Sequence, residues 1–297
     1  METATAKVAL APRQSPSATL RRQLFRSWRV VLGGVFLLIV VLVAVFARQL
    51  SPTDPIANAL DNRLRQPFTT TADGRYLLGG DTLGRDILSR VIWGARISLA
   101  VGLTAVLVAG SIGILLGLLA GYYGGKTDEV IMRIADIQLA IPTLLLAIAL
   151  IGVLGPNLRN LILVLGVSGW VIYARTMRGV VLSLRESQFV EAARALGVTD
   201  ARIIATHILR NAWTSAIVIG SQQMGYMIIT ESSLAFLGMG VPPPTPTWGG
   251  MIADGRDYLS LAWHVATMPG LILVSTVLAV NFFGDGLRDV LDPRLRL

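Results

Sequence analysis

Residues 97–122 decide the fold and read ISLAVGLTAVLVAGSIGILLGLLAGY. This stretch contains no Asp, Glu, Lys or Arg. The hydrocarbon core of a bilayer is about 30 Å thick, and a helix needs about 20 mostly apolar residues to cross it. The stretch therefore predicts a transmembrane helix.

The composition of the whole chain agrees with a membrane protein. Of its 297 residues, 53% are hydrophobic and 15% are charged, and the mean hydropathy is +0.64. A soluble domain carries about 25% charged residues. Because the chain has no cysteine, disulfide scaffolds, thiolate metal sites and cysteine nucleophiles are excluded.

Six apolar runs are long enough to be spans, so we expect an all-α membrane protein with six transmembrane helices. The runs are 30–47, 97–122, 137–154, 161–174 with an apolar extension around Val180, 212–230 and 264–283. Residues 155–157, GPN, predict a tight turn between the third and fourth runs, which would form a helical hairpin. Pro142 and Pro269 are expected to kink their helices. The first run could be a cleaved signal peptide, but its length favours an uncleaved span.

The distribution of the formal charge of +8 predicts the orientation. The tail before the first run holds six basic residues against Glu2 alone, a net of +5. The loop 175–210 holds six basic residues against three acidic ones, a net of +3. Basic loops stay in the cytoplasm, so six spans place both termini inside. Segments 124–136, which is net acidic, and 48–96, which is net basic, fit this rule less well.

Two other functions suggested by the charge and the glycines are disfavoured. The basic tail has few aromatic residues and adjoins a span, so contact with anionic lipid explains it better than nucleic acid does. Residues 120–127, AGYYGGKT, nearly match a phosphate-binding loop, but that motif follows a strand and here a membrane helix precedes it. We expect no nucleotide site in this chain.

The chain is expected to divide at the ends of these runs. We predict a cytoplasmic tail (1–29, disordered over residues 1–20), a first transmembrane helix (30–47), an external segment (48–96), a core of five helices (97–286) and a cytoplasmic tail (287–297). A second external stretch should be extended at 241–246, VPPPTP, and form a short helix at 254–259.

The loop 187–211 is predicted to form a helix, a glycine turn and a second helix. Phe189, Ala192, Ala193 and Leu196 recur at helical spacing. Gly197 can end that helix in a left-handed turn, and Thr199 can cap a second helix at 200–209. From the residues alone, this pair either rests against the bundle or fills a groove in a partner.

Several motifs together resemble one family. Glu191-Ala192-Ala193-x-x-x-Gly197, followed by 207–211, HILRN, resembles the EAA loop of ABC-importer permeases. Further motifs are similar to the second permease of dipeptide, oligopeptide and nickel importers: GGDTLGRD at 79–86, GARISL at 94–99, Asp128, Met132, Arg133, Asp136, Pro142, SLAFLG at 233–238, Trp248-Gly249 and GDGLRD at 284–289. The resemblance covers roughly residues 30–294.

This resemblance implies a type I ABC importer permease core with an extra N-terminal span, in the cytoplasmic (inner) membrane of a prokaryote. The implied partners are a second, homologous permease, two ABC ATPase subunits that bind ATP and Mg, an external solute-binding protein and the lipid bilayer, with no nucleic acid. The chain itself would hold no catalytic residue, cofactor or metal. Peptides are the expected cargo, with nickel or glutathione as alternatives. A stand-alone channel or an intramembrane enzyme is the alternative of another class.

The resemblance and the residue types together name candidate residues. Coupling to an ATPase is assigned to Glu191, Ala192, Ala193, Gly197, His207 and Leu209. The candidates for the transport pathway, or for hydrogen bonds between helices, are polar residues in the runs: Gln138, Thr143, Ser168, Gln222, Gln223 and Asn281. Gly113, Gly117 and Gly121 share one helix face and are expected to let another helix approach closely.

Two positions depart from the family pattern. The family often has proline where this chain has Arg210, which leaves the end of the second loop helix open. The external motif usually reads Gly-Thr-Asp, and Gly80 replaces the threonine.

Overall fold

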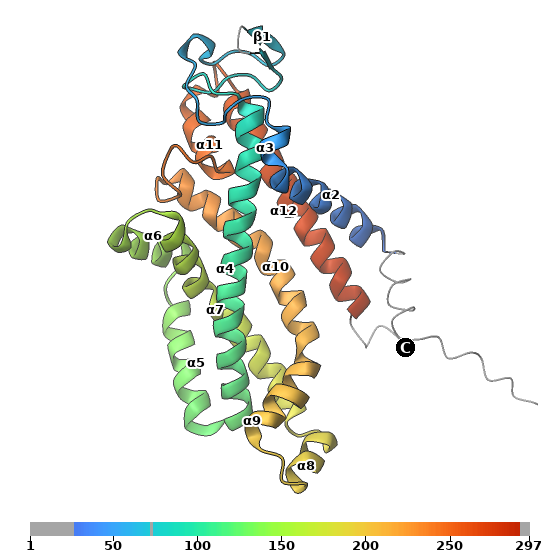
Figure 1. Cartoon of the computed structure of the whole chain (residues 1–297). Coiled ribbons are helices and arrows are strands. Elements are labelled where there is room, and N and C mark those ends of the chain that lie inside the picture. Colours follow the sequence, from blue (N-terminus) through green and yellow to red (C-terminus); the bar gives the residue numbers. More distant parts are fainter. Residues whose placement is uncertain (1–26, 72–73, 292–297) are drawn as a thin grey trace, which may run out of the picture.

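The structure is a computed structural model that describes residues 27–71 and 74–291. The predicted disorder of residues 1–20 lies outside these described residues. Five long helices form the bundle: α2 (Trp28–Val45), α4 (Ile87–Tyr123), α7 (Leu158–Leu184), α10 (Leu209–Phe236) and α12 (His264–Leu291). Figure 1 shows that the molecule has two differently built ends and that α2 and α12 stop short of the one at α8.

One end, which we call the cap, consists of residues 51–86 together with α11 (Trp248–Gly255) and η3 (Arg256–Tyr258). The first part of the cap follows α3 (Ala47–Leu50) and contains η1 (Leu60–Asn62). It also contains a small antiparallel hairpin of β1 (Thr69–Thr71) and β2 (Gly74–Tyr76), in which Thr69 pairs with Tyr76.

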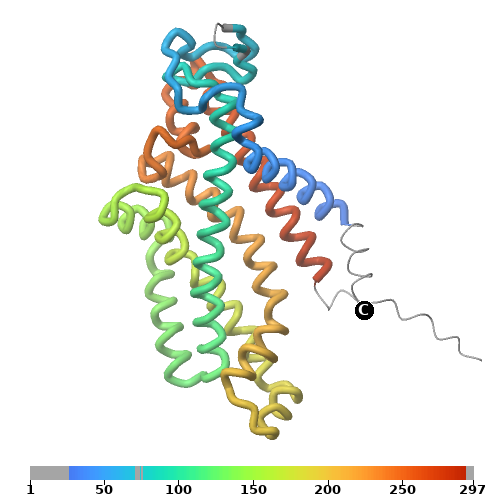
Figure 2. Tube along the Cα trace, viewed as in Figure 1, coloured from blue at the N-terminus to red at the C-terminus, as the bar shows by residue number. Residues whose placement is uncertain are grey.

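The other end, which we call the loop end, carries α8 (Gln188–Ala195), α9 (Asp200–Arg202) and η2 (Ile203–Ile208). The tube in Figure 2 shows that α4 runs from the cap to the loop end as one helix. Figure 2 also shows that α2 lies beside α12, although the two helices are far apart in the sequence. These two helices approach closely, since a Cβ on Gly33 would lie 2.7 Å from the carbonyl oxygen of Ala279.

The third predicted span is not one straight helix. α5 (Gly125–Leu139) and α6 (Thr143–Leu154) meet at an angle of 88°, and Pro142 sits at the start of α6. Pro142 therefore separates two helices, because proline cannot donate the backbone hydrogen bond that would continue the first. The hairpin prediction holds for α6 and α7, which are joined by a short turn at 155–157.

Four described helices are long and apolar enough to cross a membrane: α2, α4, α7 and α12. The count rises to five when α5 and α6 are taken as one broken span. α10 is 28 residues long but more polar, and it does not pass the same test. Length and composition of the described residues thus support several spans without fixing six.

Two helices extend beyond the apolar runs that predicted them. α4 begins at Ile87 rather than at 97, because Asp86 caps it by accepting from the N–H of Ser89 at 2.8 Å. α12 continues to Leu291, so the first residues of the predicted tail, 287–291, are helical. The short helix expected at 254–259 is present over 254–258, as the end of α11 followed by η3.

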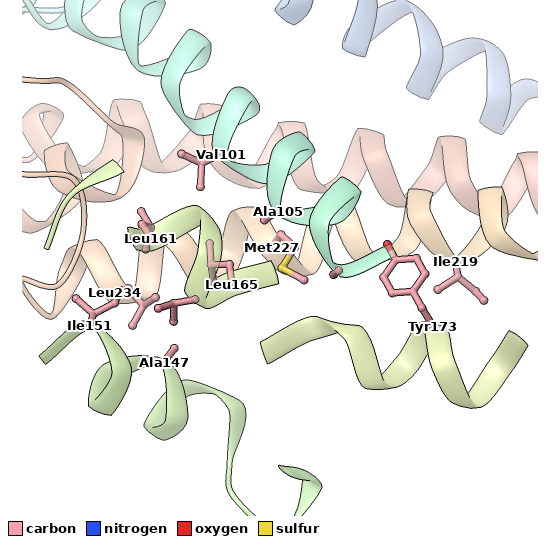
Figure 3. Packing of buried hydrophobic residues seen from close by; sticks show 12 residues of the cluster. Val101, Ala105, Ala147, Ile151, Leu161, Leu165, Tyr173, Ile219, Met227 and Leu234 are labelled. Atoms are coloured by element: carbon pink, nitrogen blue, oxygen red, sulfur yellow. The ribbon is translucent and has the colours of Figure 1, made fainter. Parts of the chain in front are cut away.

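The core of the bundle lies where α4, α6, α7 and α10 meet. Figure 3 shows Ala105, Leu165, Met227 and Ile151 from these four helices packed together. α4 and α7 pack closely, because Gly113, Gly117 and Gly121 of α4 face α7. A Cβ on Gly117 would lie 2.6 Å from the carbonyl oxygen of Ala174. Glycine is required there by the approach of the α7 backbone.

Candidate functional site

The loop between α7 and α10 begins with a helix whose end is fixed by its own backbone. Gly197 follows α8 with φ of +75°, in the left-handed region that favours glycine. The N–H of Gly197 donates to the carbonyl of Arg194 at 2.9 Å, and that of Val198 donates to Ala193 at 3.1 Å. This pair of bonds is a Schellman motif, as the sequence predicts for a glycine at this position.

An apolar core joins this loop to the ends of three bundle helices. Val190 and Ala193 of α8 are buried with Ile203 and Ile208 of η2. The other buried members come from α4, α7 and α10: Leu118, Tyr122, Met177, Val181, Ala212 and Ala216. Full burial of a Val, Leu, Ile or Met side chain stabilises a structure by about 1.5–3 kcal/mol. The loop is therefore a rigid part of the bundle rather than a separate arm.

Polar contacts hold both halves of the loop to the end of α4. The Tyr122 phenol donates to the Asp200 carboxylate at 2.5 Å, and the Arg194 guanidinium lies over the Tyr122 ring at 5.2 Å from its centroid. Arg185 donates to the carbonyl of Gly121 at 3.2 Å. A displacement of the loop must therefore move α4 as well.

Two ion pairs join α5 to α7. Arg178 donates two hydrogen bonds to Asp128, each of 2.5 Å, and Arg175 pairs with Asp136. Asp128 and Asp136 belong to the motif residues noted in the sequence. Their contacts show that they link neighbouring helices.

The outward side of α8 is open. Glu191, Ala192 and Gly197 are exposed, and Leu196 is 83% exposed. Among the described residues, the Glu191 carboxylate has no hydrogen-bond or ion-pair partner, so it does not cap its own helix. Phe189 is also exposed. We call these five residues the loop-tip surface; exposed apolar side chains on a rigid element are typical of a surface that another protein covers.

The predicted second loop helix, 200–209, is not a separate element. α9 continues through η2, a π-helical segment, into α10 without a break. Neither glycine nor proline occurs from Asp200 to Ile219, and Arg210 stands where the family often has proline. Nothing therefore ends the helix at the membrane end of the loop.

Thr199, His207 and Leu209 do not belong to the loop-tip surface. Thr199 has the extended backbone of a capping residue, but its hydroxyl makes no capping bond. His207 and Leu209 are partly buried at the root of α10. The loop candidates thus separate into an exposed set on α8 and a packed set, Ala193, His207 and Leu209.

The polar candidates inside the runs separate as well. Gln138 bridges α5 to α7: it donates to the carbonyl of Ser168 at 2.9 Å and accepts from the indole N–H of Trp170 at 2.7 Å. Asn281 packs against α10, since a Cβ on Gly225 would lie 2.9 Å from its Oδ1. These two residues join helices.

Of the other four candidates, Gln222 lines a cavity of about 400 Å³ between α7, α10 and α12. Gln223 is the next residue and faces a different side of α10. The Ser168 hydroxyl is buried without a hydrogen-bond partner in the described part of the chain, and Thr143 starts α6.

A buried ion cluster in the cap was not predicted from the sequence. Asp81 contacts Arg85 at 2.7 Å and Arg90 at 3.3 Å, and these three side chains are at most 5% exposed. Asp254 of α11 lies 3.7 Å from each arginine. Burial raises the pKa of Asp254, and the two arginines oppose that rise. The motif at 79–86 contains Asp81 and Arg85, but only the fold brings Asp254 to them.

The chain matches two known families. The pattern of the family described as "Binding-protein-dependent transport system inner membrane component" matches residues 113–297. The chain belongs to this permease family. A second pattern, "N-terminal TM domain of oligopeptide transport permease C", matches residues 15–67, which include α2.

Curated relatives of the permease cover nearly its whole length. It is 41% identical to the di/tripeptide transport system permease protein DppC of Pseudomonas aeruginosa over 294 residues, which is 96% of this chain and 97% of that protein. It is 42% identical to the glutathione transport system permease protein GsiD of Pectobacterium atrosepticum over 284 residues, 95% of this chain and 93% of that protein. The predicted family is confirmed.

A solved structure shows the fold of the permease core. A chain of the MetNI methionine ABC transporter in an inward-facing conformation superposes with a TM-score of 0.56 at 21% identity. The superposition covers 68% of the permease and 96% of that chain. The permease thus has the predicted ABC importer core, and it is longer than its structural neighbour.

Proposed function

We propose that the permease forms half of the translocation pathway of an ATP-driven importer of di- or oligopeptides in the inner membrane of a prokaryote. The observation that carries this proposal is the loop-tip surface, which is open on a loop otherwise packed into the bundle. Family membership supports transport. The relative named for di- and tripeptides supports the cargo.

In this proposal the loop-tip surface sits in a groove on an ATPase subunit that binds ATP and Mg. When the two ATPases close on ATP, they pull the loop. The core around Val190 and Ile203 passes that displacement to α4, α7 and α10, because a packed element moves as a unit. Glu191 would bond to the ATPase, Ala192 would allow close approach, and Gly197 would set the angle of α8.

The proposed topology has six spans, with the loop end and both termini in the cytoplasm. The broken pair α5–α6 and the polar α10 would supply the two spans beyond the four that length and composition identify. The cap would then face the external solute-binding protein. A second, homologous permease would complete the pathway, which explains how a polar helix such as α10 is tolerated.

Glutathione is a second candidate cargo. The relative named for glutathione transport is as similar to this permease as the one named for di- and tripeptides. Competition between labelled dipeptide and unlabelled glutathione in the reconstituted importer separates the two. Dipeptide uptake that glutathione does not inhibit supports peptides, and uptake of labelled glutathione without any dipeptide uptake supports the second candidate.

Charge reversal on the loop tests the coupling assignment. The variant Glu191→Lys in the full importer should insert normally, lose peptide uptake and recover less ATPase on purification. Glu186→Lys is the matched control, because Glu186 is an exposed acid outside the loop-tip surface. Gly197→Pro should also abolish uptake. Normal uptake in both Glu191→Lys and Gly197→Pro would refute the assignment.

A further inference from the structure

One face of α10 differs from the rest of that helix. Residues 211, 215, 218, 222, 226, 229, 233 and 236 follow each other at steps of three or four, so they lie on one face. Each of them is exposed or only partly buried. The polar members are Asn211, Ser215, Gln222, Tyr226 and Ser233. We call these eight residues the polar stripe.

The other sides of α10 are committed to packing. Ile219, Met227 and Leu234 join the core with α4, α6 and α7, and Figure 3 shows all three in that cluster. Glu231 is fully buried among polar groups that include Ser98 of α4. The polar stripe is therefore a side of α10 that this chain leaves uncovered; the other uncovered side, with Trp213 and Ile217, is apolar.

The stripe connects two hollows at opposite ends of the bundle. Towards the loop end, Ser215, Val218 and Gln222 line the cavity of about 400 Å³, together with Thr176 of α7 and Arg288 of α12. Towards the cap, a second hollow of about 350 Å³ is lined by residues that include Ile229, Ser233 and Phe236. From 215 to 236 the helix rises about 32 Å, which equals the thickness of a hydrocarbon core.

The hydrogen-bonding groups of the stripe are not all used inside the protein. Ser233 donates to the carbonyl of Ile229 at 2.9 Å. Within the described residues, the Gln222 amide and the Tyr226 phenol make no hydrogen bond. Unpaired amide and hydroxyl groups are costly against lipid, which favours water, a polar ligand or polar groups of a partner on this side of α10.

We propose that the polar stripe lines the route of the cargo and binds the backbone of a peptide through neutral hydrogen bonds. This inference rests on the proposed import of peptides. The stripe carries amide, hydroxyl and phenol groups but no charge, which suits backbone N–H and C=O groups shared by peptides of different sequence. Arg288, at the cytoplasmic end in the proposed topology, is placed to receive a carboxylate.

The chain has no cysteine, so single cysteines report on the stripe directly. The test uses the full importer in proteoliposomes, with Gln222→Cys and Ser233→Cys against Gln223→Cys, and a small charged thiol reagent. The unsubstituted chain corrects for labelling of the other subunits. The two stripe cysteines should react at least about tenfold faster than the control, because the reactive thiolate forms in water. A saturating dipeptide should slow this reaction.

The result that would overturn the inference is equal reactivity of Gln222→Cys and Gln223→Cys, or labelling at Gln222→Cys that a dipeptide does not slow. If the unsubstituted importer takes up no peptide, the proposed function fails instead. If the unsubstituted protein imports peptide but a dipeptide does not slow the labelling of the stripe cysteines, only the stripe assignment is wrong.

Recognition of the peptide backbone, rather than of charged side chains, is tested by comparing the variant Gln222→Leu with the control Gln223→Leu. Gln222→Leu should lower the uptake of dipeptides with acidic, basic and apolar side chains by the same factor, while Gln223→Leu changes none of them by as much. A loss confined to one class of side chain would contradict backbone recognition.

Discussion

The two ends of α4 are stabilised in different ways. At the cap, its first turns are held by a buried ion cluster in which Asp81 serves both Arg85 and Arg90. At the loop end, its last turns are held mainly by apolar packing, with one phenol–carboxylate bond from Tyr122. A buried charge has few acceptable partners, whereas a close-packed apolar core transmits strain to the helices that share it. The cap end is thus suited to fix a position and the loop end to transmit a displacement.

The strongest test of this contrast is to break the ion cluster. Asp81→Ala leaves two buried arginines without their shared carboxylate and should destabilise the permease by about 3–5 kcal/mol. Asp257→Ala is the control, since that carboxylate pairs with Arg256 at the surface. Thermal unfolding in detergent measures both. Equal midpoints for the two variants would contradict the importance of the cluster.

Truncating the core of the loop should have the next largest effect. Ile203 is fully buried, and Ile203→Ala should cost about 2–5 kcal/mol, towards the low end because the loop edge can relax. The loss should appear as faster amide hydrogen exchange in α8 and η2. The exposed Ile217→Ala in α10 serves as the control. Unchanged exchange in α8 would show that the loop does not depend on this core.

Removing a single polar contact should have a smaller effect. Tyr122→Phe deletes the donor to Asp200 and keeps the ring under Arg194, so it should cost about 1 kcal/mol. Hydrogen exchange at residues 199–203 should rise while exchange in α8 changes little. If α8 loosens as much as it does in Ile203→Ala, the phenol rather than the apolar core anchors the loop.

The pH response of the cap should be the smallest effect. Burial raises the pKa of Asp254 above its unfolded value, so the folded state binds this proton more readily than the unfolded state. The contribution of Asp254 to stability therefore improves as pH falls through the range of carboxylate titration and declines as pH rises through it. Asp254→Asn should remove this component from the difference in unfolding midpoint between pH 7 and pH 4. An identical pH difference in the variant would refute the raised pKa.

Much of this fold could be predicted because its signals are local. Apolar length revealed the spans, and Gly197 revealed the end of α8, since a left-handed residue after a helix favours glycine. The continuity of α9, η2 and α10 was not predicted, although Arg210 in place of the family proline left the end of the second loop helix open. Pro142 predicted a kink but not its size. The angle between α5 and α6 depends on how α6 packs against α7, which the local sequence does not show.

Features that depend on distant residues could not be predicted. Asp254 joins Asp81 only through the packing of α11 against α4, and nothing in either local sequence names the other. The same limit applies to neighbouring residues. Gln222 and Gln223 are chemically identical, and only the packing of α10 shows that the first lines a cavity. The departure at Gly80 is also explained by the fold, because a Cβ there would collide with the carbonyl oxygen of Asn62.

Cross-linking from the tip of the loop tests the central claim most directly. Leu196→Cys, labelled with a short photoactivatable group in the cysteine-free permease, is introduced into the full importer and illuminated. The account predicts a covalent product with an ATPase subunit, whose yield changes when ATP is added. Little product is expected from Leu261→Cys, an equally apolar exposed site that follows η3 of the cap. Labelling of lipid or of the permease itself from Leu196→Cys, without an ATPase product, would contradict the account.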